Sequence, residues 1–201
     1  MSFDVDIHLR RGETDVRAAF RTGDGITVLF GPSGIGKTSV LNMVAGLLRP
    51  DRGSIRVQDR LLFGADTDLP PERRRAGYVF QDARLFPHMR VEGNLRFGSP
   101  SPEDWSHIVG LLALAPLLDR WPRSLSGGEA KRVAIARALL AGSDFLLLDE
   151  PLASLDAARG DEILTLIERI RDERGLPMLY VTHDRREAER LASHIVEMER
   201  Q

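Results

Sequence analysis

The chain has 201 residues, of which 42% are apolar and 29% charged, and its formal net charge is −2. These values are typical of a globular protein with one core and room for a small subdomain, and the slight negative charge argues against a surface built to hold nucleic acid. The lack of cysteine excludes disulfides and cysteine metal sites, and with no secretory signal or bilayer-length apolar stretch we expect any membrane connection to run through a partner.

Three strands are predicted before residue 31. Apolar and polar residues alternate over Phe3–Leu9, which predicts a half-exposed strand. Arg11–Asp15 carries a turn signal, and Val16–Phe20 reads as the second strand. The third strand is the apolar run 26–30, whose character predicts burial.

A Gly-rich loop joins this third strand to a predicted helix over residues 39–48. The loop consists of Gly31, Pro32, Ser33, Gly34, Ile35, Gly36, Lys37 and Thr38. A phosphate-binding P-loop requires this strand–loop–helix context, because glycines let the backbone approach a polyphosphate and free N–H groups face the anion. We expect Lys37 to reach the β- and γ-phosphates and the Thr38 hydroxyl to ligate Mg²⁺. The alternative is a Gly-rich turn that ends in Lys-Thr by chance, and the flanking elements argue against it.

The segment from residue 49 to residue 82 predicts short strands and an exposed connection. A breaker at 49–53 ends the helix, and 54–57 with 61–63 predict an antiparallel pair. The arginines of Pro70–Arg75 are expected to form a solvated face, and the alternative is a specific anion site. A strand at Gly77–Phe80 follows, with Gln81 at its end. The Gln81 amide has the chemistry to contact Mg²⁺ or an attacking water, although a lone glutamine at a strand end is usually polar surface.

Residues 83–135 predict a helical subdomain, because helical spacing broken by prolines replaces the strands. We expect it to be inserted into an α/β core with an antiparallel β subdomain, formed by 1–82 and 136–201. Within it, Ser126-Gly127-Gly128 is a second Gly-rich turn, before a helix predicted to run to about Ala141. The turn is a second candidate anion site, or an ordinary capping box of Ser126 with Glu129, and both interpretations can hold together. Such a pair of sites suggests two chains that share nucleotides head to tail.

Strands and helices alternate in the last third of the chain. The apolar run 145–148 predicts a buried parallel strand that ends in Asp149 and Glu150. A helix over 161–174, a strand over 178–181, a short helix over 185–192 and a last strand over 194–198 follow. This alternation predicts a mostly parallel sheet covered by helices, in which ligands bind beyond the carboxyl ends of the strands.

Three polar residues lie at such strand ends. Asp149 is suited to hold the Mg²⁺ shell, and Glu150 to polarise a water for attack on the γ-phosphate. The alternative, that the two carboxylates only cap a turn, is weakened by the P-loop upstream. His183 follows the strand at 178–181, and a single histidine there is more often structural than catalytic.

The P-loop, Gln81, the Ser126-Gly127-Gly128 turn, the Asp149-Glu150 pair and His183 follow one another along the chain in this order. Their order resembles that of the motifs in the nucleotide-binding subunits of ATP-binding-cassette (ABC) transporters. The resemblance implies a P-loop ATPase that binds ATP and Mg²⁺, with Glu150, His183 and Gln81 as catalytic residues and Thr38, Gln81 and Asp149 around the metal. It also implies a homodimer in which each nucleotide contacts residues of the opposite chain, and docking of Gln81 and the helical insertion on transmembrane permease subunits. The matching motifs are Walker A (Gly31–Thr38), the Q-loop (Gln81), the signature motif (Leu125, Ser126, Gly127, Gly128 and Glu129), Walker B (Phe145–Asp149, with Glu150), the D-loop (Ser154, Leu155 and Asp156) and the switch histidine (His183).

Two stretches, Arg74–His88 and Pro177–His183, look like the ATP-binding subunits of molybdate importers. This closer resemblance implies oxyanion uptake, a substrate-binding protein as an indirect partner, and a peripheral position on the cytoplasmic face of the inner membrane. Other ABC importers or exporters are the first alternative. The second alternative is a cassette protein of DNA repair or translation, which usually has paired cassettes or long coiled-coil insertions, and neither is seen in this sequence. The third is a purely nucleotide-sensing module, against which the intact set of Lys37, Asp149, Glu150 and His183 argues.

The chain departs from the family pattern at three places. Glu129 stands where many relatives have glutamine. The segment 8–14 holds no aromatic residue to stack on adenine, Phe3 lies early for that role, and His8 and Arg11 are left as candidates. Such subunits usually have a C-terminal regulatory domain, and we expect no regulation through a domain of this kind in this sequence, which ends at Gln201.

Overall fold

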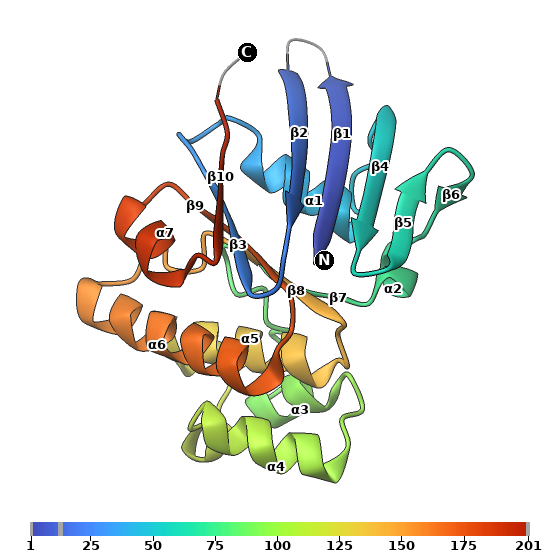
Figure 1. Cartoon of the computed structure of the whole chain (residues 1–201). Helices are drawn as coiled ribbons and strands as arrows, with labels where there is room; N and C mark the ends of the chain where they lie inside the picture. The colour runs from blue at the N-terminus through green and yellow to red at the C-terminus, as the bar shows by residue number, and fades with distance from the viewer. Residues whose placement is uncertain (1, 12–13, 200–201) are drawn as a thin grey trace.

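The computed structural model describes residues 2–11 and 14–199. Within them the chain forms two five-stranded sheets above a layer of helices (Figure 1). The turn expected at Arg11–Asp15 falls partly outside the described residues, because Gly12 and Glu13 lie in the gap. In the described part of the chain, no helix is both long enough and apolar enough to cross a membrane.

The first sheet is antiparallel and has the strand order β2-β1-β4-β5-β6. Along β1, Phe3, Val5 and Ile7 are buried against helix α1, while alternate polar residues face outward, as the period-2 pattern predicted. The pairing of β4 with β5 confirms the predicted antiparallel pair. The elements are β1 (Phe3–Arg11), β2 (Thr14–Thr22), β4 (Arg52–Val57), β5 (Arg60–Gly64), β6 (Thr67–Asp68) and α1 (Lys37–Ala45).

The second sheet is parallel, with the order β10-β3-β9-β8-β7, and confirms the predicted α/β core. Its strands β8 and β9 are buried along their whole length, which explains their unbroken apolar character. Because all five strands run the same way, the residues that follow β3, β7, β8 and β9 meet at one edge of the sheet. The strands are β3 (Ile26–Phe30), β7 (Ala76–Val79), β8 (Phe145–Asp149), β9 (Met178–Thr182) and β10 (His194–Glu197).

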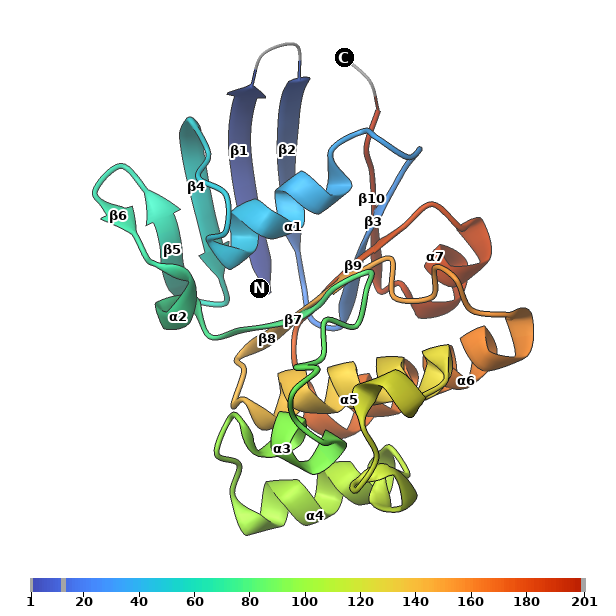
Figure 2. The same cartoon turned by 180° about the vertical axis from the view of Figure 1, so that it is seen from behind.

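Helix α5 lies between the parallel sheet and the remaining helical segment (Figure 2). It packs on β7 at one side and on α3, α4 and α6 at the others. Between β7 and α5 the described chain is helical and contains no strand, as expected, and α5 itself runs unbroken across residues 135 and 136. The helices here are α2 (Pro71–Arg74), α3 (Val91–Arg96), α4 (Pro102–Leu111), η1 (Ala115–Leu117), η2 (Pro122–Ser124) and α5 (Gly127–Leu140).

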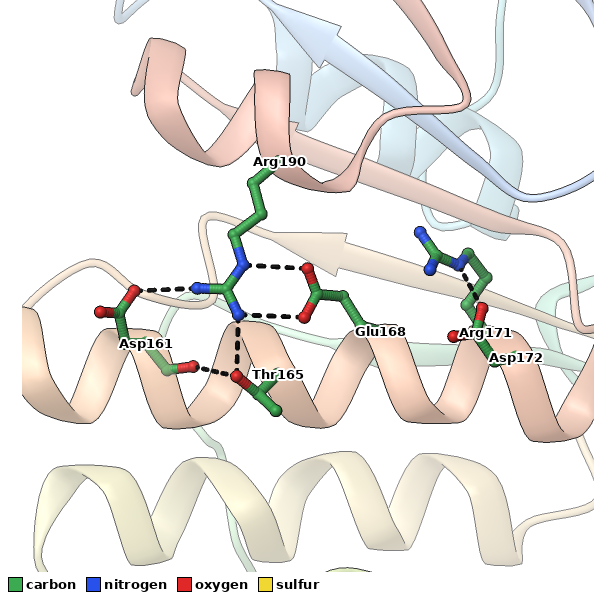
Figure 3. A network of polar contacts seen from close by, with 6 residues as sticks. All are labelled: Asp161, Thr165, Glu168, Arg171, Asp172 and Arg190. Atoms are coloured by element: carbon green, nitrogen blue, oxygen red, sulfur yellow. Dashed lines mark hydrogen bonds and ion pairs between the residues drawn. The ribbon is translucent and has the colours of Figure 1, made fainter.

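Helix α6 (Ala157–Arg174) begins four residues before the predicted start. The side chain of Asp156 accepts a hydrogen bond from the Arg159 N–H at 3.0 Å and thereby caps the helix, a signal that apolar spacing does not contain. Helix α7 (Arg185–Leu191) is fastened to α6 by Arg190 (Figure 3). The Arg190 guanidinium donates to both oxygens of Glu168, at 2.9 and 3.0 Å, and to Asp161 at 2.9 Å.

Arg73 and Arg75 are exposed, as predicted for the arginines of Pro70–Arg75, but Arg74 contradicts the prediction of a solvated face because its side chain is 1% exposed. Its guanidinium donates to the carbonyls of Met43 and Val44, at 2.7 and 3.1 Å. These carbonyls belong to the last turn of α1, where a helix lacks internal donors and favours a positive charge. Arg74 therefore caps the C-terminal end of the P-loop helix, a contact between segments 30 residues apart.

Candidate active site

The Gly-rich loop connects β3 to α1, as the sequence predicted. Gly36 precedes the helix with a φ of 102°, in the left-handed region, and a Cβ there would lie 2.8 Å from a Val16 methyl carbon. A Cβ at Gly31 would lie 2.6 Å from the Met198 carbonyl oxygen. Glycine is thus required at both positions by the packing of the loop. Pro32, Ser33 and Gly34 are exposed and Ile35 is half-buried.

Lys37, the first residue of α1, is 4% exposed and points back into the loop. Its ammonium donates to the carbonyls of Gly31 and Pro32, at 2.8 and 2.9 Å, and lies 3.8 Å from the Glu150 carboxylate. Burial lowers the pKa of Lys37, while the Glu150 and Asp149 carboxylates act in the opposite direction. A cation held in this way is aimed at the space enclosed by the loop.

Thr38 and Asp149 meet at the ends of α1 and β8, although 111 residues separate them. The Thr38 hydroxyl donates to the Asp149 carboxylate at 2.9 Å. Burial raises the pKa of Asp149, and the Thr38 hydrogen bond opposes that shift. A hydroxyl and a single carboxylate fit Mg²⁺, which usually takes one or two carboxylates and fills its other positions with water and phosphate oxygens. The described residues contain no cluster of three or more acidic, His or Cys side chains that would form an all-protein cage.

Glu150 follows directly after β8 and has a φ of 40°, which is unusual for a residue with a side chain. One carboxylate oxygen lies 3.8 Å from the Lys37 ammonium, and the other lies 3.3 Å from Nδ1 of His183. The strained backbone turns the carboxylate back toward both groups, and such strain is typical of functional sites. The structure thus joins the ends of β3, β8 and β9 at one point.

Gln81 follows β7 at the same edge, where it lines a cavity of about 510 Å³ together with Thr38 and Asp149. Two residues that the sequence analysis missed, Tyr78 and Asn42, line the same cavity. The Tyr78 hydroxyl donates to the Asn42 amide oxygen at 3.1 Å and lies 3.5 Å from Asp149. Burial raises the pKa of Tyr78, so it remains a neutral donor. The signal for Asn42 was its position four residues after Thr38, on the same face of a helix.

Asp156 lies on the other side of Glu150. It lines a cavity of about 370 Å³ with Glu150 and His183, just before α6 begins. Ser154, two residues earlier, has a φ of 76°, so the D-loop contains a second left-handed turn close to the site.

Ser126 begins α5 as a full capping box. Its hydroxyl accepts from the Glu129 N–H at 3.3 Å, and the Glu129 carboxylate accepts from the Ser126 N–H at 2.7 Å. Glu129 also lies 3.3 Å from Arg120, which gives the acidic residue at this position a structural reason. A Cβ at Gly127 would lie 3.1 Å from Leu155, so the start of α5 sits beside the D-loop.

The start of α5 and the P-loop are separate within one chain. Among the described residues no hydrogen bond or ion pair joins Ser126 or Glu129 to the P-loop, and Figures 1 and 2 place α5 in the helical layer below the strands that flank α1. At this helix start Gly127 is exposed, whereas Gly128 is buried.

The adenine candidates remain without support. Phe3 is fully buried against Phe145, so it is unavailable for stacking. The two ring nitrogens of His8 are engaged by Asp15 at 2.7 Å and by Arg52 at 3.0 Å. The side chain of Arg11 lies outside the described residues.

The family model of the ABC transporters matches residues 15–153. The chain is 54% identical to the molybdenum import ATP-binding protein ModC of Mesorhizobium japonicum, over 98% of this chain and 55% of that protein. It is also 54% identical to ModC of Rhodospirillum rubrum, over 96% of this chain and 54% of that protein. The chain thus spans about half the length of the curated relatives that it matches.

Two solved structures share the fold. One is cbiO1 from Clostridium perfringens, part of the transporter complex cbiONQ, with a TM-score of 0.82, 26% identity, and coverage of 98% of this chain and 84% of that one. The other is the ATP-binding cassette MJ0796, a dimer bound to ADP and Pi, with a TM-score of 0.76, 27% identity, and coverage of 98% and 94%. The fold, the order of the motifs and the match to the family model all indicate the same family, and this chain belongs to the ABC transporter family.

Proposed function

We propose that the chain is the ATP-hydrolysing subunit of an ABC importer that moves an oxyanion, molybdate. The observation that carries the hydrolytic part is the convergence of Lys37, Thr38, Asp149, Glu150 and His183 at one edge of the parallel sheet. The choice of molybdate rests on the relatives, which are molybdenum import proteins.

The P-loop residues bind and orient the nucleotide. The Lys37 ammonium and the N–H groups at the start of α1 face the β- and γ-phosphates. Thr38, Asp149 and Gln81 would hold Mg²⁺, which when bound neutralises the charge on these phosphates. Tyr78, whose hydroxyl lies 3.5 Å from the Asp149 carboxylate and is hydrogen-bonded to Asn42, would line the same metal site.

Glu150 acts as the general base. Its carboxylate accepts the proton of a water whose oxygen forms a bond to the γ-phosphorus, while the bond from phosphorus to the bridging oxygen of ADP breaks. His183, 3.3 Å from the Glu150 carboxylate, fixes the orientation of this base. Asp156 lines the same cavity and would contribute from the D-loop.

A second copy of the chain completes the site. Ser126, Gly127, Gly128 and Glu129 present a helix start that the P-loop of their own chain does not reach, so they would contact the nucleotide of a partner in a homodimer. The helical segment 83–135, which we treat as a subdomain, and Gln81 would dock on a permease at the cytoplasmic face of the inner membrane. A substrate-binding protein would deliver the oxyanion to that permease, and no nucleic acid takes part.

Light scattering of the Glu150→Gln variant tests the shared site. This variant keeps the size and polarity of the side chain but lacks the base, so ATP should be bound and not hydrolysed. We expect a monomer without nucleotide and a dimer with MgATP, and no dimer for Lys37→Ala under the same conditions. A mass of Glu150→Gln that MgATP leaves unchanged at high protein concentration contradicts the proposal.

Growth on limiting molybdate tests the substrate. Deletion of the gene should make growth depend on high external molybdate, and the wild-type chain, but not Glu150→Gln, should restore growth on limiting molybdate. A requirement for a different anion would retain the ATPase assignment and replace the substrate.

A further inference from the structure

The backbone just after β7 is held by a cation from α5. This segment, residues 80–84, contains the proposed metal and permease contact, Gln81. The Lys131 ammonium donates to the carbonyl oxygen of Gln81 at 2.7 Å and to that of Phe80 at 3.2 Å. Lys131 is 4% exposed, and its hydrogen bonds join residues 50 and 51 positions apart.

A second cation from α5 holds the other half of this segment. Arg137 donates through one terminal nitrogen to the carbonyl of Arg84 at 2.9 Å and through the other to the carbonyl of Ala83 at 3.3 Å. Arg137 lies six residues after Lys131 on α5. Two cations from one helix thus bind four carbonyl oxygens within five residues of backbone.

The segment is strained where Arg137 binds it. Arg84 has a φ of 45°, in the left-handed region that side chains disfavour. Its guanidinium lies 4.0 Å from the centre of the Phe80 ring, at the opposite end of the segment. A strained conformation of this kind persists only when its surroundings fix it, and Arg137 binds the carbonyl of the strained residue itself.

The identity of residue 131 is itself informative. The chain has 28 Lys and Arg residues, and only Lys37 and Lys131 are lysines. Both are 4% exposed, whereas exposed cations of the chain are arginines. An ammonium is expensive to bury, and an apolar residue in a packed helix would avoid that penalty. The burial of the Lys131 ammonium is therefore explained by the carbonyl oxygens that accept its hydrogen bonds, as is the burial of Lys37.

We propose that Lys131 and Arg137 are positioning residues, which fix the Gln81 segment to α5 so that the two move as one body. Helix α5 begins at Ser126, the group that would contact the nucleotide of the partner. The two cations would thereby link the position of Gln81 at a chain's own site to the position of the signature motif at the partner's site. This link rests on the proposed function, but the attachment of the segment to α5 does not.

Trypsin cleavage of the whole chain after Arg84 tests the attachment. The scissile carbonyl is the one that Arg137 binds, and cleavage reports the population of the opened segment. Lys131→Met removes the donors at nearly constant size, and we expect it to speed cleavage at Arg84–Leu85 about tenfold or more, since hydrogen bonds from charged donors are the strong class. Lys131→Gln retains a donor and should restore most of the protection.

Arg132→Met is the matched control. It removes a cation from the adjacent position of α5, where the guanidinium makes one long contact of 3.5 Å with the Leu112 carbonyl. We expect the Arg84 site to remain protected in this variant. Equal cleavage in Lys131→Met and Arg132→Met overturns the proposal, and so does cleavage of Lys131→Met that rises equally at all sites.

ATP turnover and ATP binding test the link separately. Lys131→Met should lower kcat about tenfold while the Kd of the monomer for ATP stays near the wild-type value, because the P-loop is untouched. A Kd that rises in step with the loss of kcat overturns the link. An inactive wild-type chain would refute the proposed ATPase, whereas the trypsin result on the attachment would stand.

Discussion

The two halves of the proposed site differ in how complete they are within one chain. At the Walker edge, defined by Lys37, Thr38, Asp149, Glu150 and His183, each functional group touches another from a different element. At the signature end, defined by Ser126–Glu129, the polar contacts are local: a capping box and an ion pair with Arg120.

This difference teaches where a second chain is needed. The Walker edge brings together the Lys37 cation, the proposed base Glu150 and the proposed metal-binding pair of Thr38 and Asp149, so we expect one chain to bind MgATP alone. The signature end is capped internally as a helix start, and in the described part of the chain no hydrogen bond or ion pair joins Ser126 or Glu129 to the P-loop. Under the proposed function, a complete hydrolytic site combines the Walker edge of one copy with the signature end of another, and the following variants test the two halves separately.

Lys37→Ala should have the largest effect, because it breaks the Walker edge itself. Loss of one preorganised charge facing the phosphates typically lowers the rate by about 10²–10³. We expect hydrolysis to fall by this amount and MgATP binding to weaken, measured by phosphate release and by titration of the monomer. Arg56→Ala, which removes a cation from the antiparallel sheet, should behave as wild type. Steady-state activity near wild type in Lys37→Ala would refute the P-loop assignment.

Ser126→Arg should break the signature end and leave the Walker edge intact. The bulky cation at the helix start blocks pairing, so hydrolysis should be lost while the monomer binds ATP nearly as the wild type does. Ser126→Ala is the control for the cap alone, which contributes about 1 kcal/mol to stability. Its unfolding midpoint should drop slightly, whereas pairing persists. Wild-type hydrolysis by Ser126→Arg in a verified complex would mean that Ser126 is only a helix cap.

Mixing Lys37→Ala with Ser126→Arg should sharpen the comparison further. In a mixed dimer one composite site carries both lesions and the other carries neither. We expect the mixture to hydrolyse ATP partially, although each variant alone is inactive, because the intact site combines the wild-type halves. A mixture that forms dimers and stays inactive would show that the two sites do not act independently.

Glu129→Gln should have the smallest effect. The N–H of Ser126 lowers the pKa of the Glu129 carboxyl, more than burial raises it. A lowered carboxyl pKa adds stability above the ordinary pKa, and that stability is lost as the pH falls through the folded-state value. We expect urea unfolding to show this acid-side loss in the wild type, and a shallower loss in Glu129→Gln, with hydrolysis nearly unchanged. If the free energy of unfolding depends on pH in the same way in both proteins, the Glu129 carboxylate does not stabilise the start of α5 as proposed.

Local sequence determined the elements that need only near neighbours. The glycines and Lys-Thr of the P-loop, the apolar run of β8 before Asp149 and the capping box of Ser126 with Glu129 are each contained in fewer than ten residues, and each was found. Their signals are steric permission, continuous burial and capping, which act over one turn or one strand.

Only the tertiary structure decided where the remaining side chains go. The charged neighbours of Arg74 predict a solvated side chain, yet it caps α1. Lys131 and Arg137 belong to no motif, yet they bind backbone carbonyls of the segment 80–84. The left-handed turn at Glu150 was likewise not visible in the sequence. The physical reason is common to all of them: their partners are backbone groups distant in the chain, and every residue type has the same carbonyl, so no local pattern of side chains records the contact.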